Sequence, residues 1–349
     1  MRRRAALRTG CLTLFVLAVA GEAGVRLWDR FHGQTGSLYD FVVPHEGRFT
    51  LRPAVSVIVP ERYGDIFYSF NRRGYRDTEP ASGPGVRRLV FLGDSVTFGL
   101  GVNQDRIYAN LLENRLRETG QPWDVANLAI FAYNTVDELA ALKEDGLRLK
   151  PELVIVQFVM NDFSIPAAAG GPAPPPTLGE RLTAAKNRLI YRSALYRRLH
   201  QAGTGLVYLA AHDARRRWFP GTLNDSQPRE QLAMLKATPD DGRIAAFRAL
   251  AAIRDTSRAA GSRTLVLLMP DEVQLFTDRY DGINRRIAAF CSHQGIALAD
   301  PLPVLRASPD RRDLYLDGVH LTEAGHRLMA TLLYGELRRR GLLESLAAP

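Results

Sequence analysis

The sequence has few cysteines, since only Cys11 and Cys291 occur among its 349 residues. Two cysteines cannot form a disulfide framework, and the CxxC and HExxH patterns that hold zinc are absent. Cys11 precedes the apolar run near the N-terminus, which argues against a lipoprotein cysteine, and Cys291 is interpreted as a small core residue. We therefore expect no cofactor and no metal.

Long apolar runs are also lacking at the N-terminus. The uncharged run from Thr9 to Gly21 has 13 residues, whereas a helix needs about 20 to span the hydrocarbon of a bilayer. It follows a basic start, which indicates an export segment within residues 1–30. Cleavage after Ala20 would give a secreted or periplasmic protein. Apolar residues continue around Glu22 and Arg26, however, and favour a single membrane anchor over cleavage. A buried cytoplasmic helix is the third interpretation.

The charge pattern lacks the features of a nucleic-acid-binding protein. The net charge is +9, but six arginines lie in the first thirty residues beside only Glu22 and Asp29. The remaining bases are spread among many acids without interleaved aromatic residues, so we expect no nucleic-acid partner. A polyanionic glycan or an anionic membrane surface stays open. The pattern does not indicate an oligomeric state.

Residues 31–84 form an N-terminal extension of short alternating runs, and βα units follow. We place the main domain at residues 85–345 and expect a flavodoxin-like three-layer α/β/α sandwich with about five parallel strands, whose ligands bind at the carboxyl ends of the strands. The expected strands are Arg88–Leu92, Trp123–Leu128, Leu153–Phe158, Thr264–Met269 and Ile296–Ala299. The expected helices are Ile107–Glu118, Thr135–Arg148, Gly242–Ala259, Tyr280–His293 and Thr322–Arg340.

An insertion of about 163–239 interrupts this alternation. It contains a loop rich in proline at Gly170–Pro176 and a basic segment with helical spacing at Leu178–His200. We interpret the basic segment as a solvated helix face. The alternative is a lid or a helix apposed to a membrane.

Three strand or loop ends carry the candidate chemistry. Ser95 follows the first expected strand in Gly93-Asp94-Ser95. A serine at the junction between a strand and a helix can expose its hydroxyl at the edge of the sheet. His320 and Asp317 lie three residues apart before the last helix, and they can supply the base and its orienting carboxylate. His320 alone of the seven histidines has this setting, while His326 is interpreted as a surface or packing residue. Asn161, after the third strand, can donate to an oxyanion.

Together, GDSxxxxG, Asn161-Asp162 and Asp-x-x-His resemble the SGNH/GDSL hydrolases in order and sheet position over roughly Arg87 to Arg340. The resemblance implies that Ser95 is the nucleophile, His320 the general base and Asp317 its partner. It also implies an oxyanion hole made by the backbone of Ser95, the backbone N–H of Ala132 and the side chain of Asn161. Upstream, Asn71-x-x-Gly74-x-Arg76 is similar to a stretch that precedes the sheet in membrane-anchored bacterial members.

Three residues depart from the pattern of the family. Ala129, Ala132 and Val159 stand where the family shows glycine. Alanine keeps its N–H, so Ala132 can still donate, but a side chain there costs about 1 kcal/mol if the backbone needs φ > 0. We expect Val159 to narrow the pocket near the acyl group. These changes bear on the size of the substrate more than on catalysis.

The expected function is an extracytoplasmic serine esterase that removes O-acyl groups, specifically acetyl, from a carbohydrate or another ester substrate. The same triad also permits an O-acyltransferase acting on envelope polysaccharide, since a sugar hydroxyl can replace water as the acceptor. A non-catalytic glycan-binding or assembly factor with a degenerate site is a further alternative. So is a lysophospholipase or thioesterase acting at the membrane.

Overall fold

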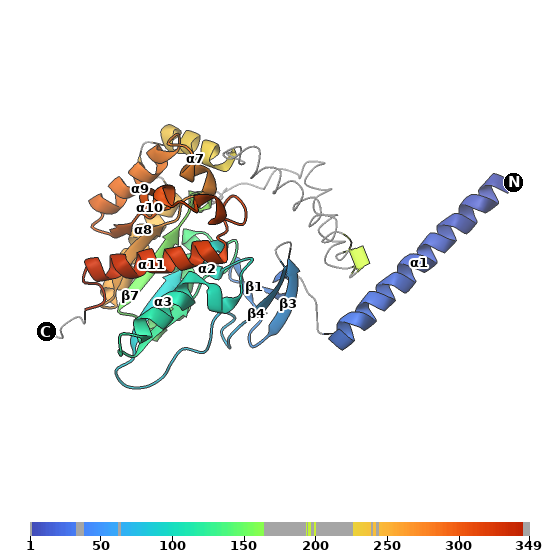
Figure 1. Ribbon diagram of the computed structural model, residues 1–349, viewed down its shortest axis with the longest axis horizontal. Helices are drawn as coiled ribbons and strands as arrows, with labels where there is room; N and C mark the ends of the chain where they lie inside the picture. Colours follow the sequence, from blue (N-terminus) through green and yellow to red (C-terminus); the bar gives the residue numbers. More distant parts are fainter. Residues whose placement is uncertain are drawn as a thin grey trace.

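The computed structural model describes the chain at residues 2–32, 38–61, 64–163, 193, 195–196, 199, 226–238, 240–241 and 244–344. The described residues form a long N-terminal helix, a small β-rich extension and an α/β body (Figure 1). The proline-rich loop at 170–176 lies outside the described residues. So does the basic segment at 178–200, except for Ser193, Leu195, Tyr196 and Leu199. The interpretation of that segment, like the boundaries of the three parts, stays a prediction.

The body contains a five-stranded parallel sheet in the order β6-β5-β7-β8-β9, which is flavodoxin-like. All five expected strands are confirmed, each with ends within one residue of the prediction. The order places the N-terminal strand of the body, β5, between β6 and β7, so that three strand ends adjoin at one edge of the sheet. The strands are β5 Arg87–Leu92, β6 Trp123–Asn127, β7 Leu153–Phe158, β8 Arg263–Leu268 and β9 Ala297–Ala299.

Alternating side chains of each strand build two separate cores. On β5, Leu89 and Phe91 pack in the core beneath α3 and α11, while Val90 and Leu92 pack in the core beneath α4, α8 and α9. Both faces of the sheet are therefore covered, as expected for parallel strands. The helices of the body are α2 Ser95–Phe98, α3 Tyr108–Arg117, α4 Thr135–Ala141, α7 Ser226–Ala237, α8 Ala245–Ala259, α9 Asp281–His293, α10 Leu302–Ala307 and α11 Glu323–Arg339.

Helix α4 is shorter than the expected Thr135–Arg148. It ends at Ala141, and the chain continues as a π turn over Leu142–Gly146 and a 3-10 turn over Leu147–Leu149. A Cβ at Gly146 would lie 2.9 Å from the Leu142 side chain, so glycine allows this wider turn to pack closely. Periodicity predicted the helical path but not the change of helix type.

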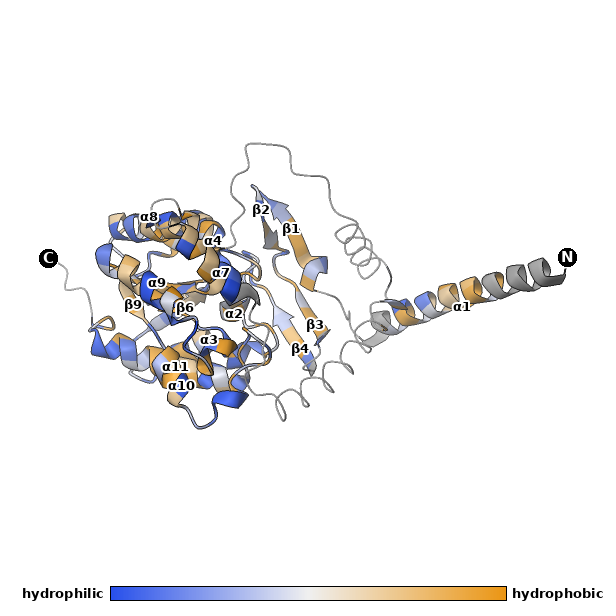
Figure 2. Cartoon of the chain, turned by 90° about the horizontal axis from the view of Figure 1, so that it is seen from above, coloured by the Kyte–Doolittle hydropathy of each residue, from blue (hydrophilic) through white to orange (hydrophobic). Residues whose placement is uncertain are grey.

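The N-terminal extension joins the core of the body. It contains a 3-10 turn and two antiparallel hairpins, and both Figure 1 and Figure 2 show the hairpins between the body and α1. Tyr68 and Phe70 stack on Phe98 at centroid distances of 5.8 and 6.3 Å, which brings the extension against α2. Its elements are Leu38–Phe41, β1 Val42–His45, β2 Arg48–Leu51, β3 Ser56–Glu61 and β4 Gly64–Ser69.

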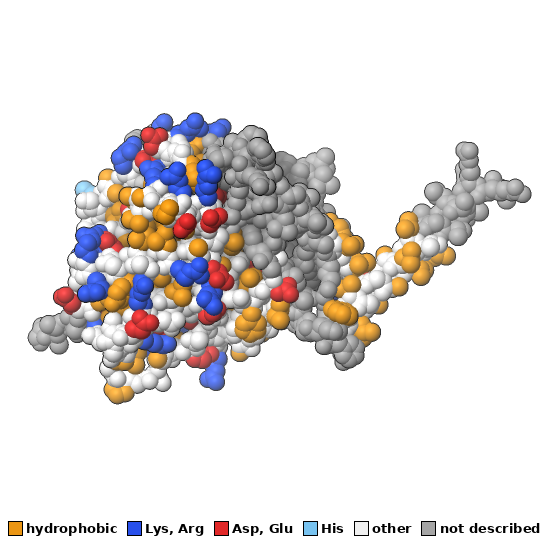
Figure 3. Space-filling model, viewed as in Figure 1, with side chains coloured by type: hydrophobic (Ala, Val, Ile, Leu, Met, Phe, Trp, Pro, Cys, Tyr) orange, Lys and Arg blue, Asp and Glu red, His pale blue; other side chains and the backbone are white. Residues whose placement is uncertain are grey.

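The first helix, α1 Arg2–His32, projects from the rest of the chain (Figure 1). Apolar side chains along its middle are exposed (Figure 3). Glu22 accepts hydrogen bonds from the Ser193 hydroxyl at 2.8 Å and from the backbone N–H of Leu195 at 3.0 Å. Among the helices of the described ranges, none has the length and apolar character needed to cross a bilayer.

Candidate active site

The strand-to-helix turn after β5 places Ser95 at the carboxyl edge of the sheet. A Cβ at Gly93 would lie 2.5 Å from Thr97 Oγ1 and 2.7 Å from Gln157 Oε1, so only glycine fits before the turn. Asp94 then caps α2, because its carboxylate accepts the backbone N–H of Val96 at 2.9 Å. Ser95 is the first residue of α2, where a backbone N–H has no partner within the helix.

The structure brings Ser95, His320 and Asp317 together in one hydrogen-bonded chain. Ser95 Oγ lies 2.9 Å from His320 Nε2, and His320 Nδ1 lies 2.9 Å from Asp317 Oδ2. The side chains of His320 and Asp317 are 18% and 16% exposed, so both are mostly buried but remain in contact with solvent. This is the arrangement that activates a serine hydroxyl.

The loop that carries Asp317 and His320 is held at both ends. Its base closes where Leu316 N donates to His320 O at 2.7 Å, beside an isolated bridge between Tyr315 and Leu321. The Tyr315 hydroxyl donates to Pro270 O, which follows β8, at 2.5 Å. A tethered hairpin of this kind keeps the imidazole in a fixed place relative to the sheet.

Asp317 is ionised in this setting. Burial by itself would raise its pKa, but the hydrogen bond and the charge of His320 oppose this, as do the backbone N–H groups of Val319 and His320 at 2.9 Å each. Together they hold the pKa of Asp317 well below its ordinary value. The charged carboxylate favours the Nδ1–H tautomer of His320, in which Nε2 faces Ser95 Oγ and can accept its proton.

Two further residues at the same edge were expected to form the oxyanion hole. Ala132 follows β6 and has φ of +61°, so the left-handed backbone that favours glycine is present with a side chain in place. This conformation costs about 1 kcal/mol for alanine. The loop lies against the nucleophile turn, because Ile130 N donates to Gly93 O at 3.3 Å.

Asn161 follows β7 and points toward the same turn. Its Nδ2 donates to Asp94 Oδ2 at 2.7 Å. An amide nitrogen carries two hydrogens, so one N–H remains for a substrate oxyanion while Asp94 orients the group. The role of Asp94 was missed from the sequence, although the residue lies in the Gly-Asp-Ser tripeptide.

A group of buried carboxyl groups lies beneath the site and was also missed from the sequence. Burial and then the charge of Asp94 raise the pKa of Asp162 to about 7, despite its bonds from Val159 N and Thr135. Burial raises the pKa of Glu138 well above its ordinary value, and neither of its oxygens bonds to a described residue. Burial and the nearby acids disfavour the ionised forms, so the raised pKa values favour retention of protons in this group up to near neutral pH.

Asp271, which lies after β8, is a third buried carboxyl group with a raised pKa. Its protonation can be tested by the dependence of stability on pH. Burial, followed by the charges of Asp94 and Asp317, raises the pKa of Asp271 to about 7. An acid whose pKa is higher in the folded than in the unfolded chain stabilises the fold while protonated. That stability is lost as pH rises through the folded-state pKa. Asp271 lies three residues after the last residue of β8, near the end of a strand that was expected from the sequence.

We therefore expect the Asp271→Asn variant to lose less stability than the wild type between about pH 5 and about pH 8.5. The difference in unfolding free energy between the two proteins should change by about 1 to 4 kcal/mol over this range, as measured by urea unfolding. Asp278→Asn is the matched control, because Asp278 is exposed in the following loop. Parallel pH profiles for Asp271→Asn and the wild type would show that Asp271 ionises freely.

Two residues outside the triad have the packing roles that the sequence allowed. His326 on α11 is buried and stacks on Tyr108, whose backbone N–H donates to its Nδ1 at 3.2 Å. Burial, followed by the charges of Arg76 and His320, lowers the pKa of His326 to about 3, so it is neutral. Cys291 on α9 is buried in the core.

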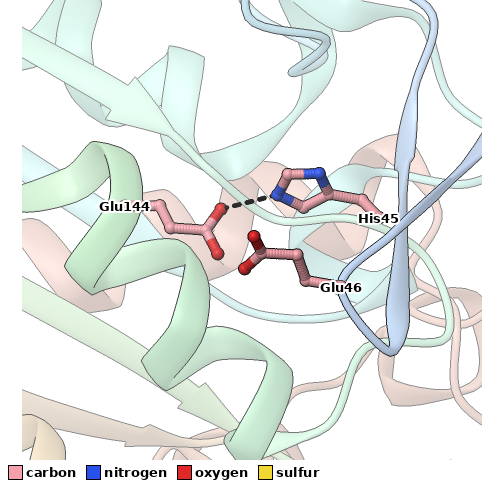
Figure 4. A group of neighbouring side chains, drawn as sticks. All are labelled: His45, Glu46 and Glu144. Atoms are coloured by element: carbon pink, nitrogen blue, oxygen red, sulfur yellow. Dashed lines mark hydrogen bonds and ion pairs between the residues drawn. The ribbon is translucent and has the colours of Figure 1, made fainter.

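One cluster of metal-binding side-chain types occurs among the described residues, formed by His45, Glu46 and Glu144 (Figure 4). His45 Nε2 lies 3.0 Å from Glu144 Oε2, and the guanidinium of Arg48 forms an ion pair with the same oxygen. A cation already neutralises this carboxylate, so we interpret the cluster as an ion-pair network that ties the β1–β2 hairpin to the turn after α4.

The model of the GDSL-like Lipase/Acylhydrolase family matches residues 91–328. No curated protein sequence matches the chain. Among solved structures, the chain is similar to TesA, with 18% identity, coverage of 72% of this chain and 99% of that chain, and a TM-score of 0.43. It is also similar to the psychrotrophic esterase EstA from Pseudoalteromonas sp., with 13% identity, coverage of 73% and 99%, and a TM-score of 0.43. The acetyl xylan esterase AlAXEase has 13% identity, coverage of 72% and 99%, and a TM-score of 0.43.

Proposed function

The chain belongs to the GDSL-like lipase/acylhydrolase family, whose members are serine ester hydrolases, and on this premise we propose that it removes O-acetyl groups from a carbohydrate outside the cytoplasm. The observation that carries the proposal is the hydrogen-bonded chain from Ser95 Oγ through His320 to Asp317, with 2.9 Å at each step. An intact chain of this kind argues against a degenerate, non-catalytic site.

The geometry supports a two-step acyl transfer. His320 Nε2 takes the proton of Ser95 as Oγ attacks the ester carbonyl, and the ionised Asp317 stabilises the imidazolium. The tetrahedral oxyanion accepts hydrogen bonds from the backbone N–H groups of Ser95 and Ala132 and from the Asn161 amide. His320 then gives its proton to the leaving alcohol, and an acyl-serine remains.

The second step returns the enzyme to its starting state. Water gives a proton to His320 as its oxygen attacks the acyl carbon, and Ser95 leaves with that proton while the carboxylic acid is released. A sugar hydroxyl in place of water would transfer the acyl group instead, with the same proton movements. The acceptor is therefore what separates an esterase from an O-acyltransferase.

An exposed aromatic ring beside the oxyanion loop supports a sugar substrate. Tyr39 is 56% exposed, and its ring packs edge-to-face on Phe131 at a centroid distance of 5.3 Å. Phe131 immediately precedes Ala132. A rigid aromatic face with a polar tip suits the packing of a sugar ring next to the reacting ester.

The substrate proposal predicts a preference for acetyl esters on sugars. Release of 4-nitrophenol should be faster from the acetyl ester than from the butyryl and octanoyl esters, and acetylated oligosaccharides should release acetate. Tyr39→Ala should raise KM for the oligosaccharide about 3- to 10-fold and leave KM for the aryl acetate unchanged. Phe67→Ala is the control, because Phe67 is an aromatic residue of the extension that is 48% exposed.

Two results would replace this proposal by one of its alternatives. A marked preference for the octanoyl ester would favour a lysophospholipase or thioesterase acting at a membrane. Recovery of the acetyl group on an added oligosaccharide, rather than as acetate, would favour an O-acyltransferase. The proposed location outside the cytoplasm depends on the N-terminal sequence alone.

A further inference from the structure

The Asn71-x-x-Gly74-x-Arg76 stretch of the extension forms a tight turn against the body. Asn71 Oδ1 accepts the backbone N–H groups of Arg73 and Tyr75 at 3.0 and 3.1 Å, which shapes the turn. Gly74 has φ of +83°, and a Cβ there would lie 2.2 Å from Leu51 O. Each of these residues is thus required for the backbone that delivers Arg76.

Arg76 is fully buried at the end of the nucleophile helix. Its Nη1 donates to Phe98 O at 3.1 Å and to Gly99 O at 2.5 Å. Its Nη2 donates to Phe67 O at 3.1 Å and to Val102 O at 2.7 Å. One side chain of the extension therefore joins β4, the end of α2 and the loop that follows α2.

The burial of this cation is unusual, because each of these four partners is a backbone carbonyl rather than a carboxylate. A buried charge is costly unless it is well paired. The Arg76 guanidinium lies 3.9 Å from the centroid of the Tyr68 ring, which adds a cation–π contact. Burial lowers the pKa of Arg76 to about 10, while Tyr68 and Glu61 act in the opposite direction, so the group stays charged at neutral pH.

Two of the four carbonyls that Arg76 binds, those of Phe98 and Gly99, lie at the end of the helix that starts at Ser95. Helix α2 has only four residues, and the carbonyls at a helix end lack partners within the helix and carry partial negative charge. We propose that Arg76 is a positioning residue that fixes the end of α2 and thereby the place of the Ser95 hydroxyl and N–H. This inference rests on the proposed function of Ser95 as the nucleophile.

The next residue of the extension supports the same helix through a second path. Asp77 Oδ2 accepts the backbone N–H of Asn127 at 2.8 Å, and Asn127 Nδ2 donates to Thr97 O at 2.9 Å. Arg76 and Asp77 therefore reach α2 from its end and from its side. The extension thus acts as part of the support of the active site.

The test compares Arg76→Met with Arg76→Lys and with the control Arg88→Met. Arg88 is a suitable control because it lies at the opposite end of β5 and likewise binds backbone carbonyls, including Leu149 O at 2.6 Å. In the full chain we would measure the rate of Ser95 labelling by a fluorophosphonate, kcat and KM for 4-nitrophenyl acetate, thermal unfolding, and hydrogen exchange of the amides of residues 98–100.

Arg76→Met should label Ser95 about 100-fold more slowly and lower kcat by a similar factor, because a displacement of about 1 Å of a reacting group has this effect. Its KM should change little, and its amides at 98–100 should exchange faster. Arg76→Lys should recover part of the rate, since an ammonium keeps the charge but has fewer donors. Arg88→Met should unfold at a lower temperature, yet its labelling rate and the exchange at 98–100 should match the wild type.

Labelling of Arg76→Met at the wild-type rate would overturn the inference. So would an equal loss of labelling in Arg88→Met, which would indicate a general effect of destabilisation. If Arg76→Met does not fold, Arg76→Lys decides the question by the same measurements. Absence of labelling in the wild type would instead refute the proposed role of Ser95. In that case the hydrogen exchange of the amides at 98–100 still tests whether Arg76 fixes the end of α2. Unchanged exchange in the Arg76 variants would refute this, and faster exchange would agree with it.

Discussion

Replacing Ser95 with alanine is expected to lower kcat for ester hydrolysis by about 10⁴- to 10⁶-fold and to abolish labelling by a fluorophosphonate. The hydroxyl that lies 2.9 Å from His320 Nε2 is the group that forms the acyl bond, and no other atom of the triad replaces it. His320→Ala should give a loss of similar size, because the hydroxyl then has no base. The two losses should not add in the double variant, since residues that act as one unit are not additive.

The matched control for this experiment is Ser56→Ala. Ser56 lies in the β3–β4 hairpin, where its hydroxyl bonds to Ser69 Oγ at 2.9 Å, and its loss should leave labelling and kcat unchanged. Retained hydrolysis by a folded Ser95→Ala protein, or a label that maps to another residue, would assign the chemistry to a different nucleophile.

Asp317→Asn is expected to lower kcat by about 10⁴-fold while the protein stays folded. An amide NH₂ facing His320 Nδ1 would stabilise the tautomer in which Nε2 carries the proton, and that nitrogen could no longer accept the proton of Ser95. The oxygen of the new side chain can still accept the N–H groups of Val319 and His320, so the loop should keep its shape.

The pH profile and a nearby variant make this prediction specific. Because the pKa of Asp317 lies well below its ordinary value, loss of wild-type activity on moderate acidification cannot come from protonation of Asp317. Asp310→Asn is the control, since Asp310 is exposed in the preceding turn and should retain full activity. A rate within about 10-fold of the wild type for Asp317→Asn would show that another group orients His320.

Several features of the site could be read from the sequence because they depend on local pattern. Short apolar runs at β5, β6 and β7 marked the strands, and polar residues directly after them marked their carboxyl ends, which meet at one edge of a parallel sheet. The Asp-x-x-His spacing indicated one loop for both groups. Ser95, His320 and Asp317 do lie in one hydrogen-bonded chain, and the catalytic roles assigned to them stay predictions until the variants above are measured.

Other features could not be read in this way. Arg76 was quoted within a motif, but nothing in its neighbours along the chain indicates that its guanidinium reaches carbonyls 22 and 23 residues later. The raised pKa values of Glu138 and Asp162 depend on burial in the tertiary structure, which a strand or helix pattern does not specify. The short helix α10 was also missed, since a run of six residues gives too little periodicity.

The sequence by itself determined where the strands lie, because strands follow from side-chain periodicity. It also determined which polar residues come after each strand along the chain and which of them have the functional groups for acyl transfer. Only the tertiary structure decided that His320 reaches Ser95 across 225 residues, that Ala132 takes a left-handed backbone and that the extension supports α2. The physical reason is that distances between remote groups and the dihedral angles of a loop depend on how the sheet and its helices pack, and packing is a property of the whole chain.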